Sequence, residues 1–180
     1  NTDLFVGDLF HIPLADGSVD VLYTSHSLEP NGGLEAAAIA ECLRVARRAV
    51  VLVEPLHELA SPEARARIEH HGYVRNLRHV AQSLNAEVVD YRLLDYCPNP
   101  LNPSGVLLLR KPTVENAQSD ASQLWSCPLT RATLKALPDL YFAPDVGIAY
   151  PLMRGIPLLR PEHAVVASAI AGDYVGARFS

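Results

Sequence analysis

Three polar segments of the sequence follow apolar runs and contain side chains that can move protons or hold a ligand. Asp8 ends the run at residues 3–8, residues 24–29 follow a second run, and residues 54–57 follow a third. Histidine and carboxylate side chains placed at a cleft can act as general acids or bases. The candidate catalytic residues are therefore His26, Glu29 and His57.

The apolar runs predict the strands that would position these groups. Residues 3–8, 19–24 and 49–53 are short, bounded by turn-forming residues, and unbroken enough to suit strands buried on both faces. Residues 34–48 show the apolar spacing of one helix face and carry arginines in the expected last turns. Strand, helix and strand within about 35 residues predict a parallel βαβ unit. Ligands of such sheets bind beyond the carboxyl ends of the strands.

The chain then continues as helices and strands before a change of composition. Ser61 and Pro62 begin a predicted helix over residues 62–71, and a second helix is predicted over 76–84. Strands are predicted at residues 86–94 and 106–110. Residues 112–123 are polar and contain proline, which is typical of a linker. We therefore predict a first domain at 1–111, a linker at 112–123 and a small module at 124–180.

The order of motifs in the first domain resembles a known family. Residues 7–22 read GDLFHIPLADGSVDVL, residues 41–45 read ECLRV, and the aliphatic run after them closes on Pro55. This order is similar to that of class I S-adenosylmethionine-dependent methyltransferases of the type 11 kind, over roughly residues 3–111. The resemblance implies an α/β fold with a Rossmann-like sheet that ends in an antiparallel strand pair.

The resemblance also implies a cofactor and the residues that hold it. S-adenosylmethionine would be held at two places. Asp8 would accept from the adenine amino group, with the backbone of Leu9 or Phe10 against the ring. The loop after residues 19–24 would pass the methionine part, at Thr24, Ser25 and His26. Each residue has a plainer reading, because carboxylates and serines often cap turns and a histidine there often lies at the surface.

Two strands of the family's sheet have no counterpart in the sequence. They carry the glycine-rich cofactor loop, and no G-x-G-x-x-G occurs among the 180 residues. The resemblance places these strands between residues 3–8 and 19–24 in the sheet, whose unpaired backbone groups would need partners. The explanations are a longer parent protein, a cleaved fragment, or a partner copy that completes the sheet. We expect the first.

Residues 124–164 resemble a second family, the zinc-ribbon-like activator subunits of methyltransferases. The segment YPLMRGIPLL at 150–159 carries the most specific part of that likeness. Cys127 matches the first zinc ligand, but the other ligand positions hold Thr130, Ala143 and Val146. A structural zinc site needs four soft or imidazole donors, so we predict a small α+β module without metal. Its predicted core is Leu134, Leu137, Tyr141, Phe142, Tyr150, Ile156 and Leu158.

Composition restricts the remaining classes of function. The net charge of −5 gives no reason to expect nucleic acid, and no apolar run is long enough to span a membrane. Three cysteines without a disulfide framework favour reduced thiols and a cytoplasmic protein. The expected function is methyl transfer to an unknown acceptor, with a homo-oligomer or a partner chain as the alternative source of the missing strands. The competing hypothesis is a non-catalytic pseudoenzyme or scaffold that has lost cofactor binding.

Overall fold

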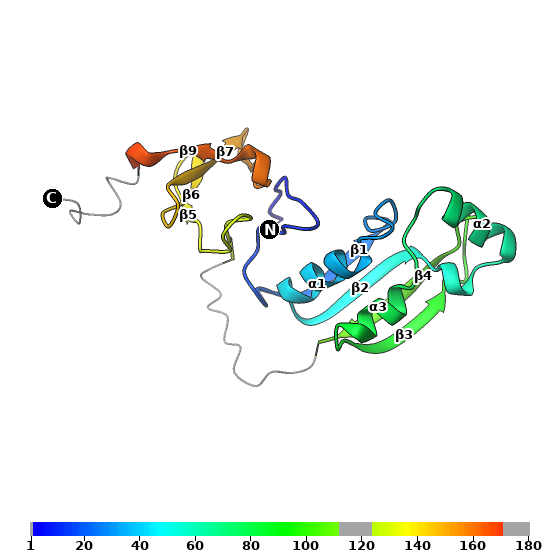
Figure 1. Cartoon of the computed structure of the whole chain (residues 1–180). Helices are drawn as coiled ribbons and strands as arrows, with labels where there is room; N and C mark the ends of the chain where they lie inside the picture. The colour runs from blue at the N-terminus through cyan, green and yellow to red at the C-terminus, as the bar shows by residue number, and fades with distance from the viewer. Residues whose placement is uncertain (1, 112–123, 171–180) are drawn as a thin grey trace. The chain divides into compact units, whose positions relative to one another are not determined.

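The chain folds as two compact units (Figure 1). A computed structural model describes residues 2–111 and 124–170. The sheet unit spans Val19–Gln118, and the small unit combines Asn1–Ser18 with Ser119–Ser180. The first residues therefore group with the C-terminal segment, whereas the sequence predicted that they would belong to a domain at 1–111. The predicted linker at 112–123 lies outside the described residues.

The sheet unit is a mixed α/β structure with four strands in the order β1-β2-β4-β3. β1 and β2 are parallel, and β4 is antiparallel to both β2 and β3. The parallel strand–helix–strand unit and the antiparallel ending predicted from the sequence are both confirmed. The elements in chain order are β1 (Val19–Ser25), α1 (Glu35–Val45), β2 (Ala46–Pro55), the 3-10 helix η1 (His57–Leu59), α2 (Pro62–His70), α3 (Leu77–Ser83), β3 (Glu87–Leu93) and β4 (Ser104–Arg110).

Alternate residues of the two central strands form the core of this unit. Val50 and Leu52 of β2 and Leu107 and Leu109 of β4 have no exposed surface. α1 and α3 contact each other and the sheet, and Figure 1 shows them side by side over it. Burial of these aliphatic side chains, worth about 1.5–3 kcal/mol each, is what holds β2 and β4 at the centre. The polar ends of β1 and β2 therefore adjoin the buried centre of the sheet.

The helix predicted over residues 34–48 is shorter in the structure, so the prediction for its end was wrong. α1 ends at Val45, and Ala46 is already extended and pairs with Val19 of β1. Arg47 lies in β2 and donates to Asp20 at 2.5 Å. This hydrogen bond is the main reason that the pKa of Asp20 lies below its usual value. Arg47 therefore connects β2 to β1, whereas Arg44 lies in the last turn of α1, where the sequence placed a cation suited to the helix dipole.

The prediction of a strand at residues 3–8 was wrong. Val6 forms only a single parallel bridge with Leu158, through hydrogen bonds to Pro157 and from Leu159. Phe5 packs edge-on against Trp125, with ring centroids 5.2 Å apart. The apolar residues of this segment thus pair with the C-terminal part of the chain. The segment belongs to the small unit and not to the four-stranded sheet.

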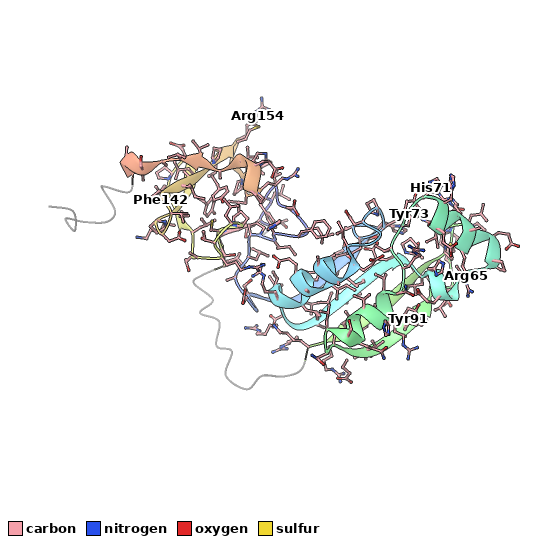
Figure 2. The ribbon with its side chains drawn as sticks, viewed as in Figure 1. Arg65, His71, Tyr73, Tyr91, Phe142 and Arg154 are labelled. Atoms are coloured by element: carbon pink, nitrogen blue, oxygen red, sulfur yellow. The ribbon has the colours of Figure 1, made fainter. Side chains whose placement is uncertain are left out.

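The small unit is built mainly from short antiparallel strands in the order β5-β6-β7-β8, with β9 on β7. Where an α+β module was predicted, its named elements are strands and one 3-10 helix. They are β5 (Lys135–Ala136), β6 (Leu140–Ala143), β7 (Ile148–Met153), β8 (Ile156–Pro157), η2 (Pro161–His163) and β9 (Val165–Val166). Arg154 and Gly155 both have positive φ and make the tight turn between β7 and β8, where Figure 2 labels Arg154.

The core of the small unit differs in part from the predicted one. Leu134, Phe142 and Tyr150 are buried as predicted, but Ile156 is exposed because it lies on the short strand β8 at the end of the sheet. The buried cluster also includes three residues that the predicted core left out, Cys127, Ala143 and Leu159. Its members are Cys127, Leu134, Ala143, Tyr150 and Leu159, with Phe5, Trp125 and Tyr141 packed against them. Phe5, from the N-terminal segment, therefore packs against this core.

Candidate functional site

A buried carboxylate organises the loop that follows β1. Glu54, near the end of β2, has no exposed surface, and its Oε1 accepts from the hydroxyl of Thr24 at 2.9 Å. The same oxygen accepts from the backbone N–H of Ser27 and Leu28 at 3.1 and 3.2 Å, and Oε2 accepts from Glu29 N–H at 3.1 Å. One side chain thus accepts four hydrogen bonds, one from the end of β1 and three from the loop. We call this arrangement the Glu54 anchor.

The protonation of Glu54 is set by two opposed effects. Burial disfavours the charged form and raises the pKa of Glu54, while the hydrogen bonds from Leu28, Thr24, Glu29 and Ser27 act in the opposite direction. Burial is the larger effect, so the carboxyl holds its proton to a higher pH than an exposed glutamate does. The Glu54 anchor supports the loop and has its hydrogen-bonding atoms directed inward.

The anchored loop places His26 in an uncommon backbone conformation. His26 has a φ of 53°, and its N–H donates to the carbonyl of Val53 at 2.9 Å. A non-glycine residue in this left-handed region costs energy and persists only where its surroundings fix it. The conformation directs the imidazole of His26 toward groups from distant parts of the chain.

His26 lies between a carboxylate and a hydroxyl. Its Nδ1 contacts Oε2 of Glu29, and its Nε2 lies 2.9 Å from Oγ of Ser104, at the start of β4. Asn102 donates from Nδ2 to Oε1 of Glu29 at 2.8 Å. The side chain of His26 is 39% exposed and that of Glu29 is 13% exposed. The imidazole therefore faces solvent while its carboxylate partner is shielded. We call these four residues the His26 cluster.

His57 lies in η1, and the structure gives it other partners than the His26 cluster. Its Nε2 lies 2.9 Å from Oε1 of Glu69, on α2. The neighbouring Glu58 accepts from the hydroxyl of Tyr91 at 2.8 Å, and Figure 2 labels Tyr91 on β3. These contacts connect η1 to α2 and β3. Of the three candidate catalytic residues, the structure brings together His26 and Glu29.

The candidate cofactor residues are divided between the two units. Asp8, Leu9 and Phe10 belong to the small unit, and Thr24, Ser25 and His26 belong to the sheet unit. Asp8 accepts from the N–H of Phe10 at 2.7 Å through Oδ1, and its Oδ2 lies 3.9 Å from Nη2 of Arg160. Asp8 therefore also has the plainer role of capping a turn. Ser25 is exposed, whereas the hydroxyl of Thr24 is used by the Glu54 anchor.

Sequence reasoning missed Ser104 and Asn102. Both lie at the end of a proline-rich loop, and Ser104 is 78 positions away from its partner His26. No local spacing connects residues so far apart. The pairing of β2 with β1 on one side and with β4 on the other brings them together. The proline-rich loop before a strand was the one available signal, and it indicates a turn and not a partner.

In the small unit, Cys127 has a tyrosine as its partner. Its Sγ lies 3.4 Å from the hydroxyl of Tyr150, and both residues are fully buried. Burial raises the pKa of Tyr150, and the contact with Cys127 raises it further. Within the described residues, no group of three or more histidine, cysteine, aspartate or glutamate side chains could hold a metal ion. The position that matches a zinc ligand is thus used in packing.

Comparisons with known proteins add no relative. No protein-family model and no curated protein matches this chain. In the described part of the chain, no helix combines the length and the apolar character needed to span a membrane.

Proposed function

We propose that the sheet unit is part of a Rossmann-like methyltransferase domain that uses S-adenosylmethionine, in a protein longer than this chain. The observation that carries the proposal is the loop at residues 25–29, which the Glu54 anchor holds at the carboxyl ends of the parallel strands β1 and β2. That edge is where open parallel sheets bind ligands. The antiparallel ending of the sheet agrees with the motif order that resembles the methyltransferase family.

The residues at this edge fit the cofactor in part. Ser25 and His26 are exposed at the end of β1 and are free of the inward-facing Glu54 anchor, so they are the residues that would hold the methionine part. Thr24 would hold Ser25 and His26 in position through the hydrogen bond from its hydroxyl to Glu54. The expectation that Asp8, Leu9 and Phe10 hold adenine comes from the sequence resemblance alone, because these residues belong to the small unit.

The cofactor supplies an electrophilic methyl group, and the chain supplies alignment and proton transfer. Alignment of donor and acceptor contributes much of the rate in such reactions. Where the acceptor must lose a proton, His26 is the proposed base because Glu29 orients its ring. Glu29 itself and His57 stay as the other candidates. The acceptor is an unknown substrate, and the three free cysteines agree with a cytoplasmic location.

The alternative is a non-catalytic pseudoenzyme or scaffold protein. Two observations favour it. The hydroxyl of Thr24 is used within the fold, and Asp8 groups with the small unit and caps its own turn. A sheet unit that keeps the strand order but has lost the cofactor would show the same features. Measured cofactor binding separates the two functions.

Titration calorimetry of the full-length protein with S-adenosylmethionine and with its demethylated product tests the proposal. We expect binding heat, and Asp8→Ala should weaken the affinity by roughly 1–3 kcal/mol because a hydrogen bond to adenine is lost. Asp3→Ala is the matched control, since Asp3 is an exposed carboxylate of the same segment. Equal affinities for the two variants would reject the role of Asp8. Absence of heat at high micromolar ligand would reject the enzyme in favour of the alternative.

A variant at the free edge of β1 can test whether a partner copy completes the sheet. Among the described strands β1 pairs with β2 alone, and it exposes Val21 and Tyr23, the latter to 72%. If copies pair at this edge, sedimentation should show an oligomer that Tyr23→Lys weakens, because lysine on an edge strand opposes pairing. Tyr96→Lys is the control, since Tyr96 is equally exposed on a loop. A monomer at every concentration would exclude this source of the missing strands.

A further inference from the structure

We propose that Ser104, His26 and Glu29 form a nucleophile–base–carboxylate relay that accepts acyl groups from activated carboxylic esters. The proposal concerns a reaction of the chain's own serine and does not rest on the proposed methyl transfer, although both use His26 and Glu29. We call the three residues the Ser104 relay.

The contacts follow the order that an activated serine requires. Oγ of Ser104 lies 2.9 Å from Nε2 of His26, which is within the distance needed for the imidazole to take its proton. Nδ1 of the same ring contacts Oε2 of Glu29, so the carboxylate favours the tautomer with its proton on Nδ1. Nε2 then has a free lone pair directed at the hydroxyl. Such relays are recognised by geometry and not by sequence order.

Each member of the relay is held in place by a further contact. Asn102 donates from Nδ2 to Oε1 of Glu29 at 2.8 Å, so both carboxylate oxygens have partners. The backbone N–H of Glu29 is bonded to the buried Glu54. Ser104 is fixed by the pairing of β4, where it lies opposite Pro55. The three side chains are therefore arranged before any substrate arrives.

The backbone of His26 supports a functional reading over a merely structural one. A loop that had only to connect β1 to the following residues could place glycine at a φ of 53° without strain. Strained non-glycine residues cluster at active sites, where the surrounding structure fixes them. The imidazole is also 39% exposed and Ser104 is partly exposed, so a small ester can reach the nucleophile.

The reaction proceeds in two balanced steps. Oγ of Ser104 bonds to the carbonyl carbon of the ester while its proton passes to Nε2 of His26. The bond from that carbon to the leaving oxygen breaks, and the leaving group takes the proton from Nε2. Water then attacks the acyl group, gives a proton to Nε2, and releases the carboxylic acid as Ser104 regains its hydrogen. Glu29 stabilises the imidazolium formed in each step.

A fluorophosphonate probe and p-nitrophenyl acetate test the relay on the full chain. We expect a single probe adduct that peptide mass spectrometry places on Ser104, and one equivalent of p-nitrophenolate released in an initial burst. Ser104→Ala should abolish both. His26→Asn should slow labelling at least about 100-fold, because the base is lost while asparagine still tolerates a positive φ.

Two further variants keep the test decisive. Ser83→Ala removes an exposed serine whose hydroxyl donates to the carbonyl of Val80, so labelling should be unchanged. Glu29→Gln keeps the shape of the carboxylate partner and should slow labelling if His26→Asn fails to fold, as judged by circular dichroism. Adducts spread over several serines would overturn the proposal. It would also be overturned if His26→Asn or Glu29→Gln, whichever folds, were labelled at the rate of the native chain. A structural role alone would change stability without any adduct at Ser104.

Discussion

Replacing Glu54 with leucine is expected to lower the free energy of unfolding of the sheet unit by about 4 kcal/mol. The substitution leaves four donors without an acceptor, namely the hydroxyl of Thr24 and the N–H groups of Ser27, Leu28 and Glu29. The hydrogen bonds from Thr24 and Leu28 are buried, those from Ser27 and Glu29 are partly buried, and each unsatisfied buried donor costs roughly 1–3 kcal/mol. Urea denaturation followed by helical circular dichroism measures the change, because α1, α2 and α3 all lie in this unit.

Glu54→Gln is the matched control for this prediction. Its carbonyl oxygen can accept the three bonds that Oε1 accepts now, whereas its amide would face the N–H of Glu29, so we expect a loss of about 1 kcal/mol. Losses of equal size in the two variants would show that the carboxylate does not anchor the loop.

The pH dependence of stability gives a second measurement on the same residue. Burial raises the pKa of Glu54 above its ordinary value of 4.5, so the native state binds this proton more tightly than the unfolded state does. The contribution of Glu54 to stability is therefore present below pH 4.5 and is lost as the pH rises through the native pKa. Glu54→Gln should remove this part of the slope. If Glu54→Gln left the dependence of stability on pH unchanged, burial would not be the larger effect on the pKa of Glu54.

The elements that the sequence predicted well are those whose signals are local. β1 and β2 were found from unbroken apolar runs, and the start of α2 from Ser61, whose hydroxyl accepts from Ala64 N–H at 3.3 Å. The end of α1 was missed because its residues also fit a strand, and pairing with β1 decided between the two. Periodicity describes the neighbours of a residue in sequence, and tertiary pairing can override it.

The predicted strand at residues 3–8 fails for a related reason. An apolar run shows that a segment will be paired or packed, but it does not say with which part of the chain. Phe5 and Val6 find their partners in Trp125 and Leu158, far along the sequence. The residues of the candidate site divide in the same way, into those that local sequence identifies and those that only tertiary pairing identifies. His26 and Glu29 were identifiable as neighbours after one strand, and Ser104 required the fold.

Replacing Tyr150 with alanine is expected to destabilise the small unit by about 3–5 kcal/mol. Tyr150 is the largest fully buried side chain of its cluster, and large-to-small changes at aromatic core positions cost this much. A unit with so few buried residues has a small free energy of unfolding. The small unit of the variant should therefore unfold at a urea concentration well below the midpoint of the native chain. Tryptophan fluorescence reports the unfolding of the small unit, because the one tryptophan of the chain, Trp125, packs against this cluster.

The matched control is Tyr150→Phe, which keeps the ring and removes only the weak hydrogen bond with the thiol of Cys127. Its cost should stay below about 1.5 kcal/mol. Because each unit has a core of its own, Tyr150→Ala should shift the tryptophan transition and leave the helical transition in place, and Glu54→Leu should do the reverse. If either variant shifted both transitions, the two units would unfold as one cooperative structure. The view that each unit has a core of its own, with residues 2–18 in the small unit, would then be wrong.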